Sequence, residues 1–143
     1  MPVIGDIMSK RIVTISPDAT FHEAAKILCE NDLGGAPVVA TTGELVGFIS
    51  ETGLIDMLFD AEARQAAVAV HMRRDVIIVR AGDSLAEAAR LLSLYGIRSL
   101  PVLEDGRLVG IVNRRDLMNY VLRTDELLTD PLIELIPSLA PMT

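Results

Sequence analysis

One pattern of hydrophobic and polar positions runs along this chain and is then repeated. It opens with a short β-branched run, at residues 12–15 and again at 76–79, and such runs are typical of strands. Apolar residues at helical spacing follow each run, and two further apolar runs and a second helical segment complete the pattern. Because the same order occurs twice, the sequence predicts two copies of a strand–helix–strand–strand–helix unit.

Polar residues indicate where the first helix of each copy begins. Thr20 and Glu23 have the spacing of a capping box, in which the hydroxyl accepts from a free backbone N–H and the glutamate reaches back to the cap. Ser84 and Glu87 repeat that spacing in the second copy. Both first helices are therefore predicted to start at a capping box.

Glycines and prolines mark the boundaries that follow. Gly34 and Gly96 stand where the first helices are expected to end, a place that often needs a left-handed residue. The second strands start at Pro37 and Pro101. Because proline lacks an N–H, we expect both prolines at the start or the edge of a strand.

A hairpin is predicted after each second strand. Thr42-Gly43 and Asp105-Gly106 have turn composition, and Asp-Gly is a particularly strong hairpin signal. The third strands, 45–50 and 108–113, then lead directly into the second helices.

The copies are joined by residues 59–71, an alanine-rich stretch that favours helix. We therefore predict a first domain at 3–60, a helical linker at 61–70 and a second domain at 71–123. The tail, 124–143, contains three prolines and is not expected to form one long helix. Its leucines and isoleucines are predicted to dock on this chain, on a second copy or on a partner.

Composition narrows the possible functions. Half of the 143 residues are hydrophobic but only 3% are aromatic, so the core is expected to be aliphatic. A net charge of −7 argues against general nucleic-acid binding, which needs a basic surface. Residues 1–69 hold 4 basic and 10 acidic side chains, whereas 70–143 hold 9 and 10. An anion site is therefore expected to draw on arginines of the second copy.

The cellular compartment is predicted from features of the same sequence. Cys29 is the single cysteine, so no intramolecular disulfide forms, which fits a reducing cytoplasm. Its place in a helical apolar pattern predicts that it is buried. We find neither a basic segment followed by a long apolar run nor about 18 consecutive apolar residues. A cytoplasmic protein without a membrane span is expected.

The second helices of the two copies begin differently. Asp116 stands one turn into the later helix, and Gly53 occupies the equivalent position in the first copy. A carboxylate there is stabilised by the helix N-terminus and can accept hydrogen bonds from both hydroxyls of a ribose. The ordinary alternative is an acidic residue that only stabilises the helix start.

The ordered series of short motifs, present twice, resembles the cystathionine-β-synthase (CBS) domain family, and the tandem resembles a CBS pair, or Bateman module. The resemblance covers about residues 3–123. The residues that carry it are Met8, Pro17-Asp18-x-Thr20, Glu23-Ala24-Ala25, Pro37-Val38 and Gly43-x-Leu45-Val46-Gly47 with their partners in the second copy, and the final Gly110-Ile111-Val112-x-x-x-Asp116-Leu117.

The resemblance implies an α/β (α+β) fold in which two β-α-β-β-α domains are related by pseudo-twofold symmetry. Members of the family bind adenine nucleotides or S-adenosylmethionine in clefts between the domains, and pairs often dimerise into a four-domain disc. The module is usually fused to an enzyme or transporter that it regulates. A stand-alone regulatory homodimer with a separate regulated protein is therefore expected here, with no required cofactor.

The resemblance also implies which residues bind the ligand. Asp116 matches the ribose-binding position, and Arg98 matches a basic position near the phosphates. Asn113 departs from the family pattern, which has Ser or Thr there; capping is its expected role, and a hydrogen bond to a phosphate or ribose oxygen is the alternative. Arg114 and Arg115 are candidates because they lie in the first turn of the helix, where one could reach a phosphate, and the alternative is that both are solvated. Other positions match pocket walls or glycines that let a base approach the backbone, with helix termination and core packing as the alternatives. The predicted ligand-binding set is Asp116, Asn113, Arg114, Arg115, Arg98, Thr20, Ala19, Ala24, Gly34, Gly35, Ile12 and Val13.

Two sites of unequal strength are expected, because Gly53 offers no side chain where Asp116 offers a carboxylate. The leading hypothesis is a non-catalytic sensor of AMP, ADP, ATP or S-adenosylmethionine. The main alternative is a structural dimerisation or adaptor module with vestigial pockets. An enzyme is not expected, since His22 and His71 are isolated and no nucleophile–base set or metal-ligand spacing occurs.

Overall fold

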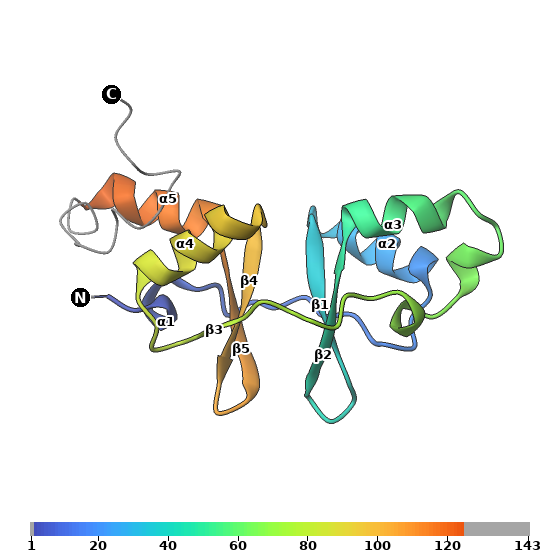
Figure 1. The fold of residues 1–143 in the computed structure, drawn as a ribbon, viewed down its shortest axis with the longest axis horizontal. Coiled ribbons are helices and arrows are strands. Elements are labelled where there is room, and N and C mark those ends of the chain that lie inside the picture. The colour runs from blue at the N-terminus through green and yellow to red at the C-terminus, as the bar shows by residue number, and fades with distance from the viewer. Residues whose placement is uncertain (1, 125–143) are drawn as a thin grey trace. The chain divides into compact units, whose positions relative to one another are not determined.

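The computed structural model describes residues 2–124 (Figure 1). Apart from Thr124, the tail predicted at 124–143 lies outside the described residues. The chain divides into two compact units. Of the described residues, unit 1 contains 2–12 and 77–124, and unit 2 is Val13–Val76. Both units combine helices with a small sheet, which confirms the α/β (α+β) fold class.

Unit 2 is built from the first sequence copy and the residues that follow it. Its two strands form an antiparallel hairpin, and its two longer helices pack together. Its elements are α2 (Phe21–Glu30), β1 (Gly35–Val39), β2 (Leu45–Ser50), α3 (Glu51–Leu58) and two 3-10 turns, η1 (Ala63–Gln65) and η2 (Val68–Val70).

Unit 1 repeats this plan with the second copy. Its three-stranded sheet has the order β3-β4-β5, with β3 parallel and β5 antiparallel to β4. Helices α4 and α5 lie side by side (Figure 1). The elements are α1 (Ile4–Ile7), β3 (Val79–Arg80), α4 (Leu85–Tyr95), β4 (Ser99–Glu104), β5 (Arg107–Asn113) and α5 (Arg114–Arg123).

The opening segment of each copy packs in the unit formed by the other copy. Ser9 pairs with Ile111 of β5 through two backbone hydrogen bonds of 2.8 and 3.0 Å. Arg73 pairs in the same way with Phe48 of β2, also at 2.8 and 3.0 Å. The boundaries of the compact units therefore differ from those of the sequence copies, because the copies exchange their first residues.

Two glycines allow this exchange. A Cβ on Gly110 would lie 2.5 Å from Met8 Sδ and 2.9 Å from the Ser9 carbonyl oxygen. A Cβ on Gly47 would lie 2.5 Å from the equivalent Met72 Sδ. Only glycine leaves room for the crossing segment at these points on β5 and β2.

Most predicted helix and turn boundaries are confirmed. Thr20 forms the complete capping box on α2, and its Oγ1 accepts from the Glu23 N–H at 3.0 Å. Gly96 closes α4 in the left-handed conformation. Asp105 and Gly106 both have positive φ, as the predicted tight hairpin requires.

The capping box predicted at Ser84 is only half formed. Ser84 accepts from the Glu87 N–H at 3.1 Å. The Glu87 carboxylate does not reach back to the cap, because it binds the Arg90 guanidinium at 2.7 and 3.0 Å. A charged partner one turn away competes for this carboxylate, and the sequence pattern of the box does not include that competition.

The predicted first strands are much shorter than expected. In residues 12–15 only Ile15 forms a bridge, to Val38, and the second run is reduced to β3. Each prediction failed for the same reason. To extend these parallel ladders, a donor would be needed from residue 37 or 101, and Pro37 and Pro101 have no N–H. Both prolines are the third residue of their strand, rather than the first.

The predicted helical linker at 61–70 is wrong. This stretch contains only η1 and η2. The Val68 side chain is fully buried in the core of unit 2, and its N–H donates to the Ala19 carbonyl at 2.8 Å. Packing of Val68 and the bridge from Ala67 to Thr20 override the helix propensity of the alanines.

Two further local predictions are corrected. Helix α2 ends at Glu30, before Gly34, and Asp32 takes the left-handed conformation with φ of 53°. A short polar side chain tolerates that conformation better than most. Cys29, expected to be buried, is exposed on α2.

Candidate functional site

The candidate site is built on the junction between β5 and α5. Asn113 ends β5 and caps α5, and its side-chain Oδ1 accepts from the Asp116 N–H at 2.8 Å. In return, Asp116 Oδ2 accepts from the Asn113 N–H at 2.9 Å. This reciprocal capping box fixes the Asp116 side chain at the first turn of the helix.

Asp116 is also half-buried. Burial raises the pKa of its carboxyl above the ordinary value, and the hydrogen bond from the Asn113 N–H opposes that effect. Among the described residues, the hydrogen bonds recorded for this carboxylate use Oδ2 alone. The other oxygen, Oδ1, therefore remains available as an acceptor in a partly desolvated position.

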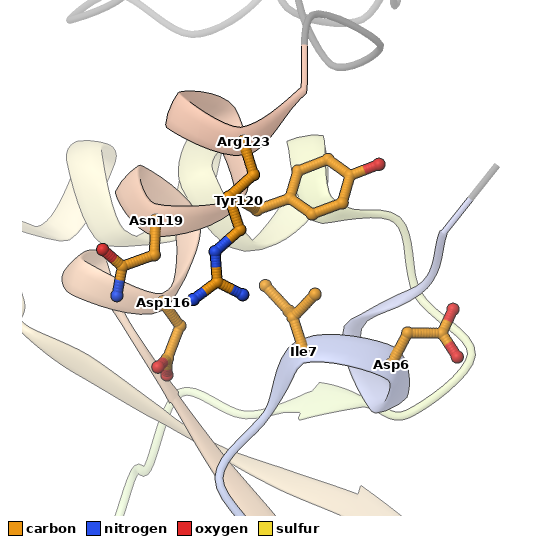
Figure 2. A pocket seen from close by; sticks show the side chains of 6 residues that line it. All are labelled: Asp6, Ile7, Asp116, Asn119, Tyr120 and Arg123. Atoms are coloured by element: carbon orange, nitrogen blue, oxygen red, sulfur yellow. The ribbon is translucent and has the colours of Figure 1, made fainter.

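A pocket of about 270 Å³ opens beside Asp116, within unit 1 (Figure 2). Helix α1 and helix α5 form its walls. The α5 residues follow one helical stripe, at i, i+3, i+4 and i+7 from Asp116. The lining residues are Asp6, Ile7, Asp116, Asn119, Tyr120 and Arg123.

Figure 2 shows how these side chains lie. Arg123 starts in the last turn of α5, and its guanidinium extends back toward Asp116. Ile7 projects from α1 toward the same space, whereas the Asp6 carboxylate lies on the far side of α1 from Asp116. Asp6 Oδ2 accepts from the Val3 N–H at 2.9 Å. The pocket thus combines an acid, a base and apolar surface.

The equivalent position of the first copy lacks the carboxylate. Ser50 caps α3, and its Oγ accepts from the Gly53 N–H at 3.3 Å. Thr52 contributes a hydroxyl 3.0 Å from that same Ser50 oxygen. A Cβ added at Gly53 would meet only Ser50 Oγ, at 3.6 Å, so the position has room for a side chain.

The predicted ligand-binding residues of unit 1 cluster at the start of α5, except Ile12. The Arg98 carbonyl accepts from the Arg114 N–H at 3.1 Å, so these residues are adjacent. The side chains of Arg98, Arg114 and Arg115 are exposed. Ile12 is half-buried and ends the opening segment of this unit.

The predicted residues of unit 2 have mainly structural contacts. Thr20 caps α2, and Ala19 accepts from the η2 backbone. The Gly34 carbonyl accepts from the Glu51 N–H at 2.9 Å, and a Cβ on Gly35 would lie 2.7 Å from the Phe48 ring. Val13 opens this unit and is half-buried.

Ala24 needs a correction. Its side chain is 0% exposed and belongs to the hydrophobic core of unit 2, so it has no surface for a ligand to contact in this structure. Ala24 lies on the buried face of α2, where packing accounts for a small residue.

Five of the lining residues were not predicted from the sequence. Asn119, Tyr120 and Arg123 follow from Asp116 by helical spacing, so a projection of α5 outward from Asp116 indicates them. Asp6 and Ile7 carry no such signal, because they reach the pocket only through the exchange of opening segments.

Two other classes of feature, a metal site and a membrane-spanning helix, are absent from the described residues. In that part of the chain, no group of three or more His, Cys, Asp or Glu side chains is arranged to hold a metal ion. No helix of residues 2–124 has the length and apolar character needed to cross a membrane.

Comparison with known proteins identifies a family. The family model of the CBS domain matches the chain twice, at residues 4–60 and 66–123. The uncharacterized protein MJ1225 of Methanocaldococcus jannaschii is 32% identical over 118 residues, which cover 82% of this chain and 42% of that protein. The chain likewise spans only 39% and 31% of two further relatives from that organism.

Solved structures give the same result for the fold. The crystal structure of CBSX2 in complex with AMP has a TM-score of 0.78 and 29% identity, over 86% of this chain and 98% of that one. CBSX2 is from Arabidopsis thaliana. The CBS domain pair of protein MJ0100, in complex with 5-methylthioadenosine and S-adenosyl-L-methionine, has a TM-score of 0.75, with the same identity and coverage.

Proposed function

Since this chain belongs to the CBS domain family and contains two such domains, we propose that it is a non-catalytic regulatory module that binds an adenosine-containing ligand. The binding residue at the centre of this proposal is Asp116. The candidate ligands are AMP, ADP, ATP and S-adenosylmethionine, and no further cofactor is required.

One observation carries the proposal. Asp116 offers an available carboxylate oxygen at the edge of a pocket, while its other oxygen is fixed by the cap of α5. A ribose presents two neighbouring hydroxyls, which are donors suited to a fixed carboxylate. Because the carboxylate is already oriented before the ligand arrives, little ordering entropy is lost on binding.

The related structures support the choice of ligand class. CBSX2 was solved with AMP, and the MJ0100 domain pair with 5-methylthioadenosine and S-adenosyl-L-methionine. All three molecules contain an adenosyl group with a ribose. We therefore propose that this chain recognises the adenosyl group of its ligand rather than a phosphate.

Ala24 is fully buried, and Arg114 and Arg115 lie off the helical stripe that lines the pocket. The other predicted residues are proposed as contributors whose roles are testable by substitution. Asn113 orients Asp116 through the capping box. We also propose that the chain forms a homodimer in the cytoplasm and regulates a separate protein through ligand-dependent changes in its conformational equilibrium.

The test is ligand-induced stabilisation of the wild type and of Asp116→Ala. A ligand that binds only the folded state stabilises it by about 2.7 kcal/mol at 100 times its Kd, which raises the melting temperature. We expect Asp116→Ala to lose this increase. Since the variant also loses half of a capping box, the readout is the difference with and without ligand, not the absolute melting temperature.

A matched control is Glu104→Ala, which removes an exposed carboxylate at the end of β4. This variant should keep the full ligand response. Equal ligand responses of Asp116→Ala and the wild type would exclude Asp116 as the ribose acceptor.

A second candidate function is an adaptor with vestigial pockets, and Gly53 favours it. A glycine in place of the carboxylate leaves the first copy without the acceptor. If the wild type shows no stabilisation with any adenosyl ligand but remains dimeric, the adaptor function is supported instead.

A further inference from the structure

The charges around the pocket restrict which adenosyl ligand it accepts. Its lining contains the carboxylates of Asp6 and Asp116 and a single cation, the Arg123 guanidinium. The Asp6 carboxylate lies on the far side of α1, so a ligand with several phosphates would place most of its negative charge near Asp116, with one guanidinium to offset it. Such a ligand is repelled at short range, where protein and solvent screen incompletely.

Helix geometry keeps the other arginines of α5 out of the pocket. Arg114 and Arg115 precede Asp116 by two positions and one, and successive side chains are rotated by about 100° around a helix. The stripe that faces α1 contains Asp116, Asn119, Tyr120 and Arg123. Arg114 and Arg115 lie off this stripe and are exposed.

Arg123 is well placed to bind an anionic group. It lies at the opposite end of the stripe from Asp116, and its guanidinium extends back over the pocket (Figure 2). Asn119 stands between them and supplies an amide that can donate or accept. Ile7 and Tyr120 add apolar surface to the lining.

We propose that this pocket selects adenosyl ligands with at most one anionic group, whose ribose binds Asp116 and whose anion binds Arg123, and that it discriminates against nucleoside polyphosphates. This proposal rests on the proposed function, because it concerns the ligand of the same site. S-adenosylmethionine meets the requirement, since its one carboxylate can pair with Arg123 while its cationic centres suit the neighbouring Asp116 carboxylate. AMP meets it less well, and ATP does not.

Isothermal titration calorimetry with four probes tests this selection. The probes are 5-methylthioadenosine, S-adenosylmethionine, AMP and ATP, and each is titrated into the wild-type chain. We expect S-adenosylmethionine to bind at least about tenfold more tightly than ATP. Affinity that rises with the number of phosphates would overturn the inference while leaving the proposed function intact.

Arg123→Met tests which residue holds the anion. This variant should bind S-adenosylmethionine and AMP about tenfold more weakly than the wild type does. Its affinity for 5-methylthioadenosine should change by less than about twofold, because that probe has no anionic group. Asp116→Asn should lower the binding affinity for every probe. The matched control Arg107→Met, at an exposed position on β5, should leave the affinity for all four probes unchanged.

The remaining outcomes also decide between the hypotheses. If Arg115→Met produces the selective loss expected of Arg123→Met, the anion lies off the α1-facing stripe and the inference is overturned. If the wild type binds none of the four probes, the proposed function fails and the inference fails with it. Circular dichroism of each variant verifies that a loss of affinity does not reflect unfolding.

Discussion

At the scale of single residues, Asp116 performs two tasks with its two carboxylate oxygens. Oδ2 completes the capping box with Asn113, and Oδ1 remains for a ligand at the pocket. The capping task accounts for a first-turn acid without any ligand. The half-burial of Asp116 and the neighbouring pocket are the observations that support a ligand-binding role in addition to capping.

Ligand affinity should depend on pH through Asp116. Burial raises the pKa of this carboxyl above its ordinary value, and the charged form is the stronger acceptor of hydrogen bonds from the ribose hydroxyls. Affinity should therefore weaken as pH falls through the raised pKa. Calorimetric titration of 5-methylthioadenosine between about pH 4 and 7 measures this, because that ligand has no phosphate that titrates.

In the ligand-free protein, the contribution of Asp116 to the free energy of unfolding should depend on pH in the opposite direction. Its folded pKa is raised, so the stability it contributes is fully present below 3.8 and is lost as pH rises through the folded value. Asp116→Asn removes both dependences. A wild-type affinity that stays constant over the same range would contradict the assignment of the charged form to ligand binding.

Substitution at Gly53 should stabilise the protein. The position has room for a side chain and lies in the first turn of α3 behind a Ser50 cap. Gly53→Ala should add about 0.5–1 kcal/mol to the free energy of unfolding, since glycine is unfavourable in a helix. Gly53→Asp should add a further few tenths to 1 kcal/mol through a new capping box and the helix dipole.

Urea unfolding of the two Gly53 variants separates these contributions. The alanine variant reports helix propensity alone, and the difference between the variants reports the carboxylate. An aspartate variant no more stable than the alanine variant would show that Ser50 already satisfies this helix start.

At the scale of elements, the sequence predicted most of what local chemistry determines. The hairpin at 105–106, the cap at Thr20 and the left-handed Gly96 depend on residues within one turn of each other, and all were confirmed. The strand lengths were wrong although their cause was visible, because Pro37 and Pro101 limit the pairing of a neighbouring strand rather than of their own.

The predictions that failed concern structure that depends on contacts between residues far apart in the sequence. Residues 61–70 have helical composition, but burial of Val68 in unit 2 determines their conformation. The pocket was only partly predictable for the same reason. Asp116 follows from the pattern, whereas α1 reaches the pocket by packing on the other sequence copy.

The opening segment crosses β5 at Gly110, and we expect this position to tolerate no side chain. Gly110→Ala places a Cβ 2.9 Å from the Ser9 carbonyl oxygen, and backbone gives way less easily than a flexible Met8 side chain. We expect a loss of about 1–3 kcal/mol in the free energy of unfolding, measured in urea, as for other overpacked positions.

Gly82→Ala is the matched control for this prediction. A Cβ at Gly82 meets nothing within 4 Å, so this variant should differ from the wild type by less than about 0.5 kcal/mol. A Gly110→Ala variant as stable as Gly82→Ala would mean that the opening segment can shift away from β5.

At the scale of the whole molecule, the compact units rather than the sequence copies are the parts that contain complete cores. Unit 2 has a core that includes Val68 and Met72, and both of these residues follow the predicted first domain, 3–60. A fragment cut at the sequence boundary therefore lacks part of its own core.

Fragments provide a test at this scale. A fragment of residues 13–76 should show helical circular dichroism and a cooperative urea transition, whereas residues 3–60 should be largely unfolded as a monomer. The expected difference follows from the loss of buried Val68 and Met72, at about 2–5 kcal/mol for each large core side chain removed. Equal stability of the two fragments would mean that the exchanged segment adds little.

The exchange of opening segments also bears on how a chain of this kind arises. A single ancestral copy could complete its core only by borrowing the opening segment of a second molecule, as in a domain-swapped dimer. Duplication and fusion of the gene would convert that dimer into one chain and keep the swap within it. Once fused, the two halves no longer have to be identical. One half can retain an aspartate at the start of its last helix while the other accepts a glycine.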